Sequence, residues 1–112
     1  MLGDISALDN IYIVCGHTDM RKSIDGLCAI VEDQLKMDPE SSSLFLFCGR
    51  RRDRIKALFH EPDGFVLIYK RLSVQGRYQW PNKESEVRNL TWKQFDWLMS
   101  GIDIDQPKAL KW

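Results

Sequence analysis

Residues 44–72, LFLFCGRRRDRIKALFHEPDGFVLIYKRL, decide the fold of this 112-residue chain. The first five residues are apolar without alternation, which predicts a strand buried on both faces. Pro62-Asp63-Gly64 is a turn sequence between two apolar runs, at about 55–60 and 65–72, and predicts a β-hairpin. The segment therefore predicts an antiparallel meander, with a basic turn at 49–54 between its first two strands.

The hairpin has two possible registers, and both gather cations at the end away from its turn. A glycine bulge places Lys56 opposite Lys70, whereas a two-residue loop places Lys56 opposite Tyr69 and Arg54 opposite Arg71. Like charges that face each other across strands are destabilising unless an anion lies between them. Phosphate is suited to this position because the guanidinium group is a planar fork of donors.

Apolar spacing before the meander predicts a strand and a helix. Residues 11–15 are a continuous apolar run, and apolar residues then recur at helical intervals from Met20 to Leu35, after an N-cap at residue 18 or 19. Arg21 and Lys22 would lie in the first helical turn, where positive charge opposes the macrodipole. Their position indicates either a phosphate or partner contact or a local pair with a neighbouring aspartate, and both interpretations stay open.

The C-terminal third predicts one more strand and a second helix. Residues 77–80 resemble a strand that stops at Pro81, and Thr91 with Gln94 forms a capping box that starts a helix. We expect the tail, 102–112, to fray. The predicted fold is α+β: a single domain over 1–112, with a small antiparallel sheet of about four to five strands and two covering helices.

Charge is unevenly distributed along a chain whose formal net charge is zero. Residues 1–49 carry three Lys/Arg and eight Asp/Glu, whereas residues 50–77 carry eight Lys/Arg and three Asp/Glu. The basic middle predicts contacts with DNA phosphates, although cations also protect sheet edges in proteins that bind no anion. The candidate DNA-binding residues are Arg50, Arg51, Arg52, Arg54, Lys56, Lys70, Arg71 and Arg77.

Three aromatic residues near this basic segment have two possible roles. Tyr69, Tyr78 and Trp80 could stack on bases, but such residues more often pack in a core or across strands.

Other features of the sequence narrow the function. No apolar run reaches the roughly 18 residues of a membrane span, and the N-terminus lacks the pattern of a secretory signal, so we expect a cytoplasmic protein. Cys15, Cys28 and Cys48 are odd in number and widely spaced, which favours free thiols. His17 and His60 lie beside carboxylates, but no third metal ligand has recognisable spacing. We therefore expect no enzyme activity, cofactor or metal.

Four blocks of the sequence together resemble the TnpB accessory proteins of the bacterial insertion-sequence family numbered sixty-six. The blocks cover about residues 10–104, in the family's order. They are GHTDMRK (16–22) with DGL (25–27); FLF (45–47) with GRR (49–51), Asp53, Ile55 and Lys56; Gly64 with KRL (70–72), GRY (76–78) and WP (80–81); and LT (90–91) with Gln94 and GID (101–103). The chain departs from the family near Phe59-His60, where a tryptophan-rich patch is usual, and in its longer link at 73–75.

The resemblance implies a mobile-element protein that is encoded beside a separate, larger transposase. Two functions then remain open. The chain could bind transposon-end DNA through its basic hairpin, or it could dock on the transposase without touching DNA. For docking, the candidate surfaces are the acidic helix face with Glu32 and Asp33, and the Trp97 side of the last helix.

Overall fold

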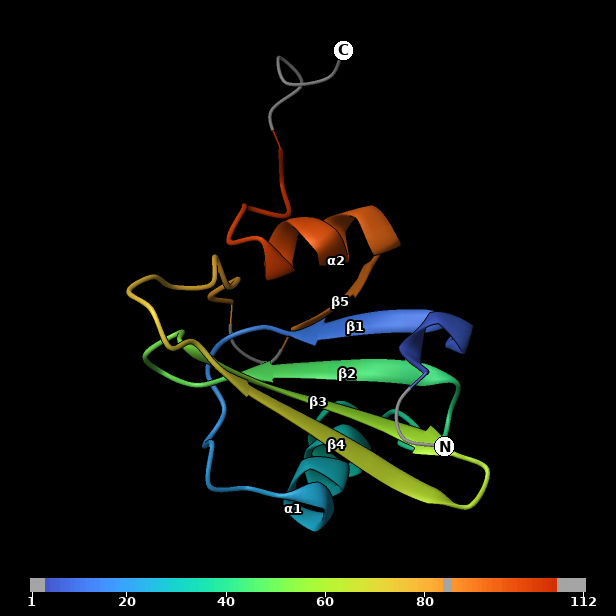
Figure 1. Ribbon diagram of the computed structural model, residues 1–112. Helices are drawn as coiled ribbons and strands as arrows, with labels where there is room; N and C mark the ends of the chain where they lie inside the picture. Colours follow the sequence, from blue (N-terminus) through green and yellow to red (C-terminus); the bar gives the residue numbers. More distant parts are fainter. Residues whose placement is uncertain (1–3, 84–85, 107–112) are drawn as a thin grey trace.

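The computed structural model describes residues 4–83 and 86–106, and it shows a five-stranded sheet in the order β4-β3-β2-β1-β5 (Figure 1). Strands β1 and β2 are parallel, and every other neighbouring pair is antiparallel. The α+β prediction is therefore confirmed. The strands are β1 (Asn10–Val14), β2 (Ser43–Cys48), β3 (Arg54–Glu61), β4 (Gly64–Arg71) and β5 (Val87–Leu90).

One helix covers each face of the sheet (Figure 1). Helix α1 (Ile24–Ala29) continues as a π-helical segment, Ile30–Gln34, and packs with Phe45, Phe47 and Leu58 on one face. Helix α2 (Trp92–Met99) lies on the other face. Because neighbouring residues of a strand point to opposite faces, the unbroken apolar run of β2 supplies both layers, and all six of its residues are buried.

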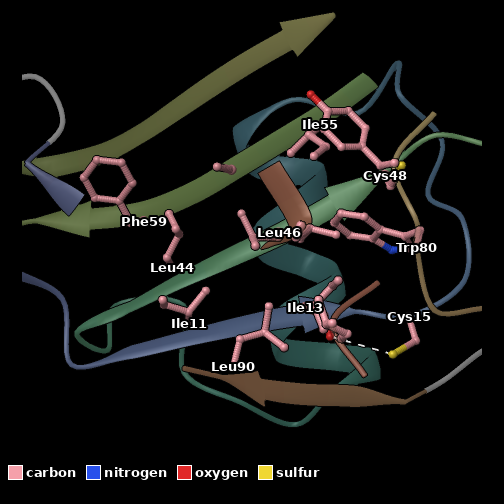
Figure 2. Packing of buried hydrophobic residues seen from close by; sticks show 14 residues of the cluster. Ile11, Ile13, Cys15, Leu44, Leu46, Cys48, Ile55, Phe59, Trp80 and Leu90 are labelled. Carbon is pink, nitrogen blue, oxygen red and sulfur yellow. Dashed lines mark hydrogen bonds between the residues drawn. The ribbon is translucent and has the colours of Figure 1, made fainter. Parts of the chain in front are cut away.

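The core beneath α2 is shown in Figure 2, where Ile13, Leu46 and Trp80 lie among the buried side chains. The Trp80 indole donates a hydrogen bond of 2.9 Å to the backbone carbonyl of Val14. The cysteines are free thiols, as predicted, although Cys28 is only half-buried. Burial raises the pKa of the Cys48 thiol to about 12.

The hairpin has the two-residue loop rather than the glycine bulge. Glu61 pairs with Gly64, and this register sets Lys56 opposite Tyr69 and Arg54 opposite Arg71. Since residues paired across strands share a face, Arg54, Lys56 and Arg71 lie on the α1 side of β3 and β4.

The first helix begins later than the sequence predicted, at Ile24 after the N-cap Ser23. The Asp19 side chain accepts a hydrogen bond from the Arg21 amide at 2.9 Å, and the Lys22 amide donates to the Asp19 carbonyl at 3.1 Å. These bonds close a separate turn, so Arg21 and Lys22 precede the helix and do not oppose its macrodipole.

The expected strand at 77–80 is wrong, and the strand that does form, β5, was not predicted. The Tyr78 amide donates to the Arg52 carbonyl at 2.8 Å, so this segment is held by a loop and not by a neighbouring strand. Strand β5 pairs with β1, with Ile11 opposite Leu90. Its sequence, Val-Arg-Asn-Leu, is too short and too polar to give a clear strand pattern.

The chain after α2 is anchored as far as the structure describes it. Ile104 is buried, and its carbonyl accepts a hydrogen bond from the Gln94 side chain. Arg88 pairs with Asp105 at 2.8 Å, which lowers the pKa of that carboxyl. The rest of the tail that was expected to fray, residues 107–112, lies outside the described residues. No helix in the described ranges is long and apolar enough to cross a membrane.

Candidate nucleic-acid interface

A cleft opens where β1 and β2 end. Because these two strands are parallel, the loops that follow them leave from the same edge of the sheet. One wall of the cleft is residues 17–20, and the other is the basic turn. The cleft has a volume of about 570 Å³ and is lined by His17, Thr18, Asp19, Met20, Gly49, Arg50, Arg51, Asp53 and Arg54.

Two close contacts fix the walls of this cleft relative to each other. The Thr18 amide donates to the Cys48 carbonyl at 2.8 Å. Met20 packs so closely on Gly49 that a Cβ atom added to Gly49 would lie 2.7 Å from Met20 Cγ. A side chain at residue 49 would therefore force Met20 to move.

The cations of the basic turn are unequally neutralised. Arg50 and Arg51 are exposed, and neither forms an ion pair or side-chain hydrogen bond within the described ranges. Arg54 Nε lies 3.6 Å from Asp53 Oδ1, which is too long for a hydrogen bond. Both atoms are buried, and neither has a hydrogen-bond partner in the part of the chain that the structure describes.

Asp19, the other carboxylate of the cleft, is already occupied by Arg21. The guanidinium group donates to both carboxylate oxygens, at 3.0 Å and 2.8 Å. These hydrogen bonds hold the pKa of Asp19 well below its usual range. The local pair with an aspartate, one of the two interpretations of Arg21, is thus the one that the geometry favours.

Arg52 and Arg71 flank the cleft. Arg52 has a φ of 60°, and its side chain lines a smaller hollow of about 140 Å³ with Arg50, Trp80 and Asn82. Arg71 lies directly opposite Arg54 across the β3–β4 ladder.

The remaining three cations of the predicted set do not line the cleft, and they lie on different faces, so the eight do not form one surface. Lys56 donates to the Lys22 carbonyl at 2.6 Å and lies 5.4 Å from the Tyr69 ring. Lys70 is on the opposite face of β4, where it lines a small apolar hollow with Phe95. Arg77 lies in the exposed loop after β4, near Gly101. Alternation along β4 explains why Lys70 and Arg71 diverge.

The aromatic residues also separate. Tyr78 and Trp80 are buried, 2% and 4% exposed, so they pack in the core and a base cannot stack on them. Tyr69 remains half exposed.

Sequence analysis placed His17 beside a carboxylate but in no candidate site, whereas in the structure this residue is exposed and lines the cleft with Arg50 and Arg51. The signal that could have identified it was the block GHTDMRK, which the structure brings against the block GRR. His60 lies at the opposite end of the sheet, where its ring contacts Phe65. The two histidines therefore do not share a site, and the described residues contain no group of three potential metal ligands.

The fold and the cleft define a small sheet protein with an arginine-lined recess at the ends of two parallel strands. Residues 9–109 match the family model described as IS66 Orf2 like protein. The chain belongs to this family, which makes it an accessory protein of an insertion sequence.

Two proteins of Sinorhizobium fredii (strain NBRC 101917 / NGR234) are similar to the chain. The uncharacterized protein y4hO is 36% identical over 98 residues, which are 88% of this chain and 84% of y4hO. The uncharacterized protein y4jC is 27% identical over 108 residues, which are 96% of this chain and 91% of y4jC. No solved structure matches significantly.

Proposed function

We propose that this accessory protein assists transposition by binding DNA phosphates in the cleft, with no catalytic step of its own. Arg50, Arg51 and Arg54 would contact the backbone, and Arg52 and Arg71 would extend the contact on either side. The observation that carries the proposal is that Arg50 and Arg51 line one recess without a carboxylate partner among the described residues. Arginines placed in this way recognise phosphate through paired donors.

Local geometry supports the proposal better than overall charge does. The chain is neutral, so it lacks the broad positive field of a non-specific binder. Within the cleft, however, Asp19 is neutralised by Arg21 and Asp53 lies beside Arg54, which leaves Arg50 and Arg51 as uncompensated charges. We therefore expect a short phosphate contact rather than extensive wrapping.

The test is a fluorescence-anisotropy titration with transposon-end DNA and with unrelated DNA at several salt concentrations. Each phosphate contact contributes about 0.9 to the slope of log K against log salt. Arg50→Glu/Arg51→Glu removes two contacts, so the slope should flatten by about 2. Comparison of the two DNAs shows whether the protein discriminates between sequences.

The matched control is Lys70→Glu/Arg77→Glu, which changes the net charge equally at residues outside the cleft. Its salt slope should remain close to that of the unmodified protein. Equal loss of DNA binding in both double variants would show that only the total charge of the protein matters. Unchanged DNA binding in Arg50→Glu/Arg51→Glu would exclude the cleft as the DNA-binding site.

Docking on the transposase is the second candidate. It is favoured by two large apolar side chains near the ends of α2, Trp92 and Ile102, which are 40% and 44% exposed. Trp97 between them is half-buried, and Glu32 and Asp33 are exposed on the other side of the sheet. Co-purification with the transposase that survives nuclease treatment and is lost in Trp92→Ala would support docking. Failure of the proteins to associate at any salt concentration would exclude it.

A further inference from the structure

Strand β4 is an edge of the sheet, and its centre is apolar. The five consecutive residues 65–69, Phe-Val-Leu-Ile-Tyr, contain no charge and no proline, and Ile68 and Tyr69 are 41% and 50% exposed. In the part of the chain that the structure describes, no strand pairs with the outer side of β4 (Figure 1). The other edge, β5, is only four residues long and contains Arg88 and Asn89.

A long apolar edge strand is a template for pairing with another chain. Proteins usually protect such edges by shortening them or by placing charges, prolines or bulges near their centre. Strand β5 is short and has a charged residue near its centre, whereas the charges of β4 are confined to its last two residues, Lys70 and Arg71. Of the two edges, β4 is therefore the one that is open to a partner strand.

The backbone groups that a partner would meet follow from the ladder. The Leu72 amide donates to the Asp53 carbonyl at 2.8 Å, so the backbone of Leu72 faces β3. In an antiparallel ladder, alternate residues turn their N–H and C=O groups toward and away from the neighbouring strand. The residues whose backbone groups face outward are therefore Phe65, Leu67, Tyr69 and Arg71.

We propose that the partner is a second copy of this chain, paired antiparallel along β4 with the two-fold axis at Leu67. In this register Phe65 faces Tyr69 of the second copy, and Val66 faces its Ile68. Asp63 of the turn comes next to Arg71 of the second copy. Apolar residues thus meet apolar residues, and an acid meets a base at each end, which is the pattern that stabilises cross-strand pairs.

Shifted registers lack this match. With the axis at Ile68, Val66 faces Lys70 of the second copy, and with the axis at Tyr69, Leu67 faces Arg71. The axis at Val66 sets Glu61 against Arg71, but it also sets Tyr69 against Asp63 and Ile68 against Gly64. Among these four registers, the axis at Leu67 joins the acidic turn to the basic end and keeps the apolar centre continuous. The pairing goes beyond the proposed function and does not require DNA.

A charge swap tests the register by sedimentation velocity over a dilution series. We expect the unmodified protein to dimerise. Asp63→Arg and Arg71→Asp should each raise the dimer Kd by about tenfold or more, because each sets like charges against each other twice in the symmetric pair. The double variant, Asp63→Arg/Arg71→Asp, restores opposite charges and should restore dimerisation. Both positions are exposed, and circular dichroism checks that each variant folds.

The proposal would be overturned if the unmodified protein were monomeric or if the single variants dimerised as tightly as it does. It would also be overturned if the double variant dimerised as weakly as either single variant. Hydrogen exchange gives a second measurement. The outward-facing amide of Leu67 should be protected in the dimer and should exchange faster on dilution. A dimer in which this amide exchanges at the monomer's rate would use another surface and would equally refute the pairing.

Discussion

Gly49 lies where the two walls of the cleft meet, and its replacement by alanine should destabilise the protein through one contact. The added Cβ atom would lie 2.7 Å from Met20 Cγ, whereas unstrained carbon atoms lie roughly 3.5–4.0 Å apart. Met20 must therefore move by about 1 Å. Overpacking of this kind costs about 1–3 kcal/mol. Alanine at the same time stabilises by about 0.4–1 kcal/mol, because it reduces the freedom of the unfolded chain.

The net expectation for Gly49→Ala is a loss of about 1–2 kcal/mol in the free energy of unfolding, measured by urea denaturation. Met20→Ala removes the opposing side chain, so adding Gly49→Ala to that variant should be neutral or slightly stabilising. The coupling energy of the cycle should then be about 1–3 kcal/mol. An equal cost of Gly49→Ala in both backgrounds would refute the steric explanation and place the strain in the backbone.

Three further predictions concern single interactions elsewhere. Thr91→Ala should lower the free energy of unfolding by about 1 kcal/mol in thermal or urea denaturation, because it removes the hydroxyl that accepts a hydrogen bond from the Gln94 amide; an unchanged midpoint would show that this bond is dispensable. Tyr78→Phe should leave the free energy of unfolding unchanged or raise it by up to about 1 kcal/mol, since the buried hydroxyl has no hydrogen-bond partner among the described residues. A marked fall in the free energy of unfolding would show that the Tyr78 hydroxyl does have a hydrogen-bond partner. Asp105→Asn should cost no more than about 1 kcal/mol at neutral pH, because the pair with Arg88 is largely exposed. The hydrogen bond from Arg88 lowers the pKa of Asp105 in the folded state. The stabilisation is therefore present above the unfolded-state pKa of Asp105 and disappears as the pH falls through its folded-state pKa. A difference in unfolding free energy between Asp105→Asn and the unmodified protein that persists in strong acid would contradict this explanation.

The elements that the sequence predicted well are those with a strong local pattern. The apolar run of β2, the hairpin β3–β4 and the capping box at Thr91 each depend on residues close together in the chain. The sequence did not settle which hairpin register forms. The two-residue loop excludes the facing Lys56–Lys70 pair and sets Arg54 opposite Arg71.

The features that the sequence could not predict depend on distant contacts. Strand β5 forms because β1 offers a free edge, and residues 77–80 are irregular because the Tyr78 amide bonds to Arg52. The candidate site shows the same division. The basic turn was evident from composition, whereas His17 joins it only because β1 and β2 are parallel neighbours. The pleat likewise separates Lys70 from Arg71.

The parallel pairing of β1 with β2 also bears on how the protein folds. The β2–β3–β4 meander needs only short loops and can form early, whereas β1 reaches β2 after an intervening helix, and β5 returns to β1 from the far end of the chain. The recess between residues 17–20 and the arginine turn therefore does not exist until these slow, non-local steps are complete. A partly folded chain in which the meander has formed but β1 has not yet paired with β2 would expose the arginines without the opposite wall, so the recess forms only in a fully folded molecule.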